Sequence, residues 1–126
     1  AAQEAETAEE KYPEVEKKPE ITIDDFDKVQ IQVGEVIKCE PVPKAKKLLV
    51  SQIKIGAETR QIVSGIAKYY KPEEMVGKKV AVITNLKPCK LCGVESQGMI
   101  LAAGDDEGNL SVVTVDKDIV SGSEIC

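Results

Sequence analysis

The most reactive side chains of this chain are its four cysteines, and Cys89 and Cys92 form a Cys-x-x-Cys pattern. Such a pair can be half of a zinc site or a redox pair. Structural zinc needs four ligands, however, and only Cys39 and Cys126 remain, because the chain has no histidine. Without histidine, Ser-His and Cys-His catalytic pairs are excluded, and no phosphate-binding P-loop motif is present. We therefore predict no metal, no cofactor and no catalytic residue.

Charge distribution indicates a different chemistry, the binding of a polyanion. Residues 38–90 hold twelve Lys or Arg against four acidic residues, whereas residues 1–20, 21–37 and 91–126 are each net negative. The total charge of −5 thus hides a basic middle. Because the local field decides where a polyanion docks, nucleic acid remains a candidate partner. The alternative is a solvated, lysine-rich face without a ligand.

We predict binding residues of two kinds. Six basic side chains are candidate phosphate contacts, which position an RNA and make its affinity salt-dependent without reading its sequence: Lys44, Lys46, Lys47, Arg60, Lys87 and Lys90. Four neutral side chains could reach bases or ribose 2′-hydroxyls: Ser64, Asn85, Ser96 and Gln97. The alternative for the two serines is that they only satisfy the backbone of turns.

Strands must position these side chains, and the alternation of apolar and polar residues predicts five of them: 29–39, 48–55, 59–64, 79–87 and 98–103. Asn85 and Lys87 would lie on one face of the fourth strand, since side chains alternate in direction. A basic connection, residues 44–47, would precede the second strand. Gly34 and Glu35 indicate a bulge in the first strand.

Short helical segments complete the expected elements. Thr22 followed by two aspartates predicts a capped turn over residues 24–28, with Phe26 packed inward. Pro72 and Gly77 mark the start and the end of a helix between the third and fourth strands. Residues 110–115 could add one more strand. The pattern alone predicts a small β-barrel.

Three ordered motifs also resemble a known family. Residues 85–88 followed by 93–99 (Asn-Leu-Lys-Pro, then Gly-Val-Glu-Ser-Gln-Gly-Met) resemble the signature of the tRNA-binding domain that is appended to many methionyl-tRNA synthetases and also occurs as free-standing dimers. Residues 60–67 and 44–48 resemble the family's other recurring segments, in the same order. The resemblance covers residues 21–126.

The resemblance implies an OB-fold, a mainly β, five-stranded Greek-key barrel with a helix between strands 3 and 4 and a small C-terminal extension. It implies that tRNA is the partner and that the extension and the N-terminal turn build a homodimer. By the same analogy, Met99 lines the binding groove, although a core position is the alternative. Many relatives carry a basic residue near Cys89 or Cys92, so this chain departs from the family there.

Composition supports recognition of folded RNA rather than single-stranded DNA, because aromatic residues, on which single strands stack, are only 3% of the chain. Residues 1–20 are acidic and poor in bulky apolar groups, which predicts a disordered linker before the domain at 21–126. No apolar run is long enough to span a membrane and no signal peptide opens the chain, so we expect a cytoplasmic protein.

The leading hypothesis is a non-catalytic tRNA-binding and dimerisation module tethered to the catalytic body of a methionine–tRNA ligase. The chain begins with Ala1, so we expect a fragment or a processed chain. Two alternatives remain open. Dimerisation could be the main task, with vestigial RNA binding, or the chain could be a free-standing tRNA-binding protein.

Overall fold

The structure is a computed structural model that describes residues 12–105 and 107–126. Residues 1–11 of the predicted linker (1–20) therefore lie outside the described residues. Residues 12–20 form no helix or strand, and all of them are exposed. No helix of the described residues is long and apolar enough to cross a membrane.

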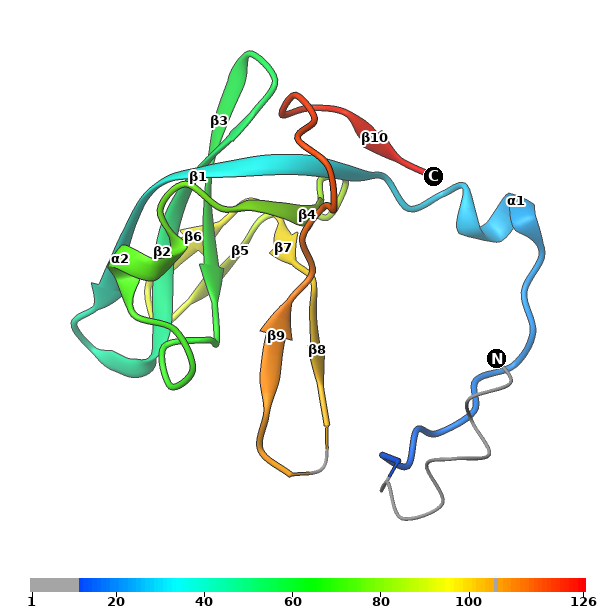
Figure 1. Cartoon of the computed structure of the whole chain (residues 1–126), viewed down its shortest axis with the longest axis horizontal. Helices are drawn as coiled ribbons and strands as arrows, with labels where there is room; N and C mark the ends of the chain where they lie inside the picture. Colours follow the sequence, from blue (N-terminus) through cyan, green and yellow to red (C-terminus); the bar gives the residue numbers. More distant parts are fainter. Residues whose placement is uncertain (1–11, 106) are drawn as a thin grey trace.

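An antiparallel sheet curls into an open, OB-like barrel (Figure 1). Its strands follow the order β3-β2-β1-β4-β7, and β10 pairs with the start of β1. The bounds are β1 (Ile31–Val42), β2 (Ala45–Ile55), β3 (Glu58–Ser64), β4 (Lys79–Ile83), β7 (Met99–Ile100) and β10 (Glu124–Ile125). The long β1 pairs with β4 through its first half and with β2 through its second half, which joins the two sides of the barrel.

The irregularity that lets β1 serve both sides is not at the predicted place. The register with β2 shifts between Val36 and Lys38, so that Ile37 is the extra residue of a bulge. Val36 is consequently buried and Ile37 is 47% exposed. Glycine is instead required at position 34 for steric reasons, because a Cβ there would lie 2.5 Å from Cγ2 of Ile53. The sequence indicated the bend correctly but not its residue.

Branched aliphatic side chains fill the barrel. Ile53, Ile62, Val80 and Val82 are fully buried, and Met75 of α2 (Pro72–Met75) joins the same cluster. Burial of one such side chain contributes roughly 1.5–3 kcal/mol. α2 lies between β3 and β4 in the chain. The core therefore forms without a buried aromatic ring among the described residues.

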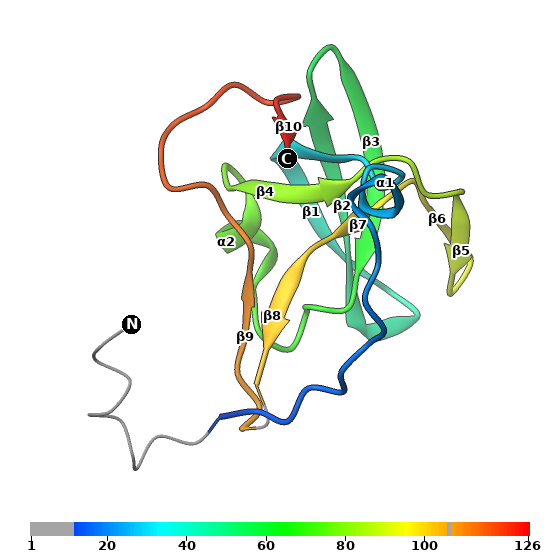
Figure 2. The ribbon, with the colours of Figure 1, turned by 90° about the vertical axis from the view of Figure 1, so that its right-hand side faces the viewer.

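Two small hairpins leave the barrel (Figure 2). One is β5 (Cys89–Leu91) with β6 (Val94–Ser96), and the other is β8 (Ala102–Gly104) with β9 (Leu110–Val112). The predicted strand over 79–87 is too long, because β4 ends at Ile83. The predicted strand over 98–103 is interrupted at Leu101, whose N–H bonds the carbonyl of Ala81 while its own carbonyl bonds Val113.

The N-terminal helical turn is α1 (Ile23–Phe26), which lies outside the barrel beyond the start of β1 (Figure 1). The predicted cap is present: the Thr22 hydroxyl accepts the N–H of Asp25 at 3.2 Å, and the Asp25 carboxylate accepts the N–H of Thr22. The prediction that Phe26 packs inward is wrong, since its side chain is 41% exposed. α1 thus keeps its apolar groups on the surface.

Candidate nucleic-acid interface

Five of the six predicted basic contacts are lysines, and we call this set the basic rim: Lys44, Lys46, Lys47, Lys87 and Lys90. All five are exposed, and none has an ion pair within the described part of the chain. Lys46 and Lys47 belong to β2, so the predicted basic connection over 44–47 is wrong beyond its first residue. Lys87 lies in the loop after β4, and Lys90 lies on β5. Unpaired, exposed ammonium groups are available to phosphate oxygens.

The hairpin β5–β6 comes to the rim because it folds against β3. The Gln61 side-chain amide donates to the carbonyl of Glu95 at 2.8 Å, and the N–H of Gln97 donates to the carbonyl of Gln61 at 2.7 Å. β3 in turn pairs along its length with β2. The elements that carry Lys47 and Lys90 are therefore joined through β3, and Figure 2 shows the hairpin beside this strand.

Arg60, the sixth predicted basic contact, has partners within the protein. Its guanidinium donates to the carbonyls of Thr84 and Gln97, and it pairs with the Glu58 carboxylate at 3.2 Å. The side chain is only 24% exposed. Arg60 thus ties β3 to the end of β4 and to the segment after β6, and part of its charge is already compensated.

Ser96 and Gln97 are placed between β3 and the segment that precedes β7. The buried Ser96 hydroxyl accepts the N–H of Val63 at 2.9 Å and donates to the carbonyl of Gly98 at 3.1 Å. The Gln97 side-chain oxygen accepts the N–H of Gln61 at 3.2 Å. These bonds replace a regular β3–β7 ladder and close the barrel. In this arrangement the Ser96 hydroxyl satisfies the backbone, which is the alternative considered above.

Asn85 also acts within the protein. Asn85 lies beyond the end of β4. The prediction that it shares a strand face with Lys87 is therefore wrong. The side-chain oxygen of Asn85 accepts the N–H of Gln30 at 2.8 Å, and its amide donates to the carbonyl of Lys28 at 2.6 Å. Asn85 therefore fastens the segment between α1 and β1 to the end of β4.

Met99 and Ser64 meet at a pocket of about 420 Å³. The end of β3 forms one side, and β7, β8 and Leu91 of the hairpin form others. Met99 is 44% exposed, which agrees with a groove position rather than the alternative in the core. The Ser64 oxygen is buried and has no hydrogen-bond partner in the described structure.

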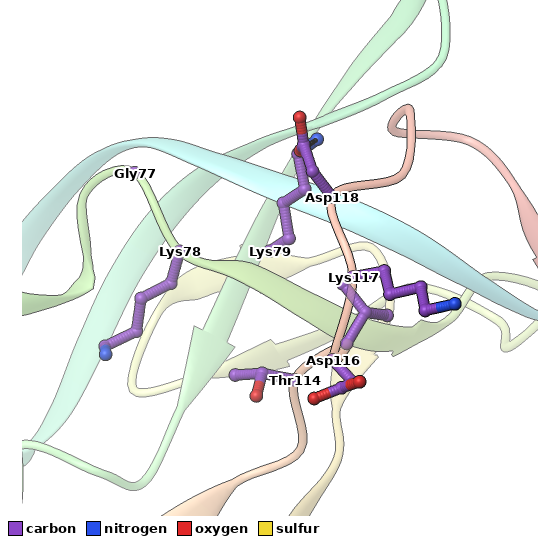
Figure 3. Close-up of a pocket in the computed structure, with 8 residues that line it drawn as sticks. Gly77, Lys78, Lys79, Thr114, Asp116, Lys117 and Asp118 are labelled. Atoms are coloured by element: carbon purple, nitrogen blue, oxygen red, sulfur yellow. Dashed lines mark hydrogen bonds and ion pairs between the residues drawn. The ribbon is translucent and has the colours of Figure 1, made fainter.

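A second hollow, of about 300 Å³, lies between β4 and the C-terminal segment (Figure 3). Lys79 and Asp118 face each other there, and the ammonium nitrogen lies 2.7 Å from the carboxylate. This contact lowers the pKa of Asp118 from its ordinary value. Lys78 extends the other way, and its nitrogen lies 5.8 Å from the centre of the Tyr70 ring. Lys79 and Lys78 already have partners, and Asp116 and Asp118 add negative charge beside Lys117, so this hollow is less suited to phosphate than the rim.

The two cysteines of the Cys-x-x-Cys pattern are exposed and unpaired. Cys92 and Gly93 form the hairpin turn with positive φ angles of 51° and 82°. The two residues between the cysteines are extended in β5, so the three Cα–Cα steps from Cys89 to Cys92 span about 10 Å, beyond the reach of a disulfide. Cys39 is buried, and burial raises the pKa of its thiol. The described residues contain no cluster of three or more potential metal ligands.

Sequence reasoning missed residues that act only once the barrel is closed. Thr84 is buried; its hydroxyl donates to the Gln32 side chain at 2.8 Å, and its carbonyl accepts from Arg60. Leu91 lines the Met99 pocket although it stands between two exposed cysteines. An apolar residue in a short polar hairpin was a signal for Leu91. Nothing local marked Thr84, because its partners are distant in sequence.

Fold and site together define a class of protein, a small OB-like β-barrel with an apolar pocket at the end of β3 and with lysines on β2, on β5 and in the loop after β4 that are exposed and have no ion pair in the described structure. The family described as "Putative tRNA binding domain" matches residues 31–124, and the chain belongs to this family.

The chain is also similar to segments of much longer proteins. It is 61% identical to the methionine–tRNA ligase of Methanocaldococcus jannaschii over 110 residues, which are 87% of this chain and 17% of the relative. It is 56% identical to the methionine–tRNA ligase of Bacillus subtilis over 120 residues, which are 95% of this chain and 18% of that protein. The chain thus spans less than a fifth of the length of these curated relatives.

Solved structures agree with the fold. A MetRS related protein from Pyrococcus horikoshii superposes with a TM-score of 0.82 at 38% identity, over 86% of this chain and the whole of that one. The chaperone CsaA from Bacillus anthracis superposes with a TM-score of 0.78 at 21% identity, over 86% of this chain and all of that one. The second likeness concerns the fold alone.

Proposed function

We propose that this chain is a non-catalytic module that captures folded tRNA for the methionyl-tRNA synthetase to which it is attached. The relatives and the family description support the partner and the attachment. The single observation that carries the binding mode is the basic rim, whose exposed lysines have no ion pair within the described residues. Aminoacylation itself would belong to the remainder of the parent protein, in the cytoplasm.

The rim would bind the phosphate backbone and would leave sequence unread. Each lysine that neutralises a phosphate releases a counterion, so affinity falls as salt rises. A single module of this kind binds with a dissociation constant of about 1–100 μM at physiological salt. Attachment raises the effective concentration of the bound tRNA at the catalytic body to about the millimolar range, so weak binding is sufficient.

A titration of the chain with bulk tRNA over a series of salt concentrations tests this proposal. We expect the plot of log K against log salt to be linear with a slope set by the number of lysines engaged. Replacing Lys47 and Lys90 with alanine should reduce the slope by about 1 for each lysine. A matched control replaces Lys54 and Lys117, which lie outside the rim. Absence of binding at low salt, or salt-independent binding, contradicts the proposal.

We also propose that the module is a homodimer through α1 and the C-terminal segment, residues 113–126. Ile23 on α1 and Val120 on the segment are 70% and 73% exposed, so both apolar side chains are available to a partner surface. Sedimentation of the wild-type chain and of an Ile23→Glu, Val120→Glu variant tests it. A monomeric wild type contradicts this part alone and leaves tRNA binding standing.

The two alternatives have distinct outcomes. If dimerisation is the main task, the dimer variant should impair the parent enzyme, and the Lys47 and Lys90 variant should not. If the chain is a free-standing tRNA-binding protein, no synthetase sequence should precede it in the same reading frame.

A further inference from the structure

The pocket that contains Met99 differs from the rest of the candidate interface, because it is apolar and lies beside the positive rim. Ile66 and Leu110 lie deeper in its wall, and Leu91 and Met99 are 39% and 44% exposed. Its volume of about 420 Å³ falls within the range of small-ligand sites, roughly 300–1,000 Å³. Exposed apolar side chains around a hollow are costly in water unless something covers them.

One polar atom breaks this apolar lining. Ser64 lines the pocket, and its side-chain oxygen has neither a protein partner in the described structure nor contact with solvent. A buried hydroxyl without a partner costs about 1–3 kcal/mol, so such atoms are uncommon in folded proteins. Ser96, whose hydroxyl accepts the N–H of Val63, the residue before Ser64, makes two hydrogen bonds. The two serines therefore behave differently, and only Ser64 has bonding capacity left.

We propose that this pocket receives one unstacked nucleobase of the bound RNA, with the polar edge of the base bonded to Ser64. The proposal rests on the proposed function and extends it from the phosphate backbone to a base. A base has flat aromatic faces and hydrogen-bonding atoms along its edge. These features are complementary to an apolar pocket with one free hydroxyl. Specific recognition of RNA uses bases splayed out in this way.

Charge complementarity favours a nucleotide over another apolar occupant. Lys90 directly precedes Leu91 in the wall, and the carbonyl of Lys47 accepts the N–H of Ala67, the residue after Ile66. The backbone of both lysines thus lies near the wall of the pocket, and long lysine side chains from there can reach the phosphates that flank an inserted base. Met99 suits the plate itself, because its thioether is flexible and packs favourably on aromatic rings.

Variants that alter only the pocket test the proposal on the full chain. Ala102→Leu narrows the pocket, and Ser64→Ala removes the hydroxyl. Ala103→Leu makes the same change one residue along β8, at a residue that does not line the pocket, and Ser111→Ala is the control for the lost hydroxyl. We expect both pocket variants to weaken tRNA binding about three- to tenfold without changing the salt slope, and both controls to bind as wild type.

A second readout does not depend on tRNA. Addition of the four nucleoside monophosphates should shift the methyl resonances of Leu91 and Met99 in the wild type and should leave them unchanged in Ala102→Leu. Wild-type tRNA binding with equal affinities for all variants overturns the inference and spares the proposed function. If the wild type does not bind tRNA, the proposed function is contradicted. If nucleotides also leave the methyl resonances of the wild type unchanged, the proposed base-binding pocket is contradicted as well. Shifts caused by a leucine-rich peptide but not by nucleotides would assign the pocket to a protein partner instead.

Discussion

The polar residues of the candidate interface fall into two groups that differ in what their side chains already bond. Arg60, Ser96 and Gln97 bond to backbone atoms of β3 and of the segments that close the barrel. Lysines of the basic rim, such as Lys47 and Lys90, are exposed and have no ion pair within the described residues. We call the first group the closure cluster. The closure cluster and the hairpin that carries Lys90 both contact β3.

This difference separates architecture from binding. The closure cluster consists of three residues of the sequence motifs, and its hydrogen bonds serve to close the barrel. The rim consists of lysines, four of which (Lys44, Lys46, Lys47 and Lys87) also lie in the motif segments, and none of the five has an ion pair within the described residues. Substitutions in the closure cluster should therefore change stability first, whereas substitutions in the rim should change binding alone.

Ser96→Ala should have the largest effect on stability. It leaves the buried N–H of Val63 without its acceptor, so the free energy of unfolding should fall by about 1–3 kcal/mol. Urea denaturation measures this change. Ser64→Ala is the matched control, since its buried hydroxyl makes no bond in the described structure and its removal should not lower the free energy of unfolding. Equal losses in the free energy of unfolding for both variants would contradict the distinction between the bonded Ser96 and the unbonded Ser64.

Arg60→Lys sharpens the comparison because it keeps the charge and removes the planar guanidinium. A lysine cannot bond both Thr84 and Glu58 in the same way, so we expect a loss of about 1–2 kcal/mol in stability. Binding of tRNA by the folded fraction should not change. Lys90→Gln should do the reverse, with unchanged unfolding and a salt slope reduced by about 1. A fall in tRNA affinity for folded Arg60→Lys would move Arg60 into the binding group.

The sequence predicted the barrel well, because period-two alternation and turn residues are local signals. The mainly β, OB-like fold and the cap at Thr22 follow from such signals together with the family resemblance. The bulge at Ile37 and the end of β4 at Ile83 could not be located in this way. Both depend on which strand a residue pairs with, and that is decided by tertiary packing.

The candidate site was predictable in composition but not in detail. Residue type alone identified Lys47 and Lys90 as basic groups, and the structure leaves them exposed. Residue type could not tell Ser64 from Ser96, because the Ser96 hydroxyl accepts its hydrogen bond from Val63, which is 33 residues away. For the same reason, Asn85 could not be recognised as the residue that fastens the segment before β1.

Asn85→Ala should have a smaller, local effect. The substitution removes two hydrogen bonds to the backbone of Lys28 and Gln30, each worth about 0.5–1.5 kcal/mol at most because the site is exposed. Hydrogen exchange at the Gln30 amide should become faster, while exchange in the core strands stays the same. Asn109→Ala, in the β8–β9 turn, is the control and should leave Gln30 unaffected. A global loss of protection would place Asn85 in the closure cluster.

Asp118→Asn should have the smallest effect, since this ion pair with Lys79 is open to solvent. The contact lowers the pKa of the folded Asp118 below its ordinary value of 3.8. Because the pKa is lowered, ionised Asp118 stabilises the fold at pH values above the pKa that the group has in the unfolded chain. This stabilisation disappears as the pH falls through the pKa of the folded state. Thermal unfolding should therefore show the variant slightly less stable than wild type at pH 7, with the difference vanishing in acid and in high salt. A difference that persists in acid would mean that the Asp118 carboxylate is not its source. The C-terminal segment would then be held against β4 mainly by backbone bonds such as that from Ala81 to Val113.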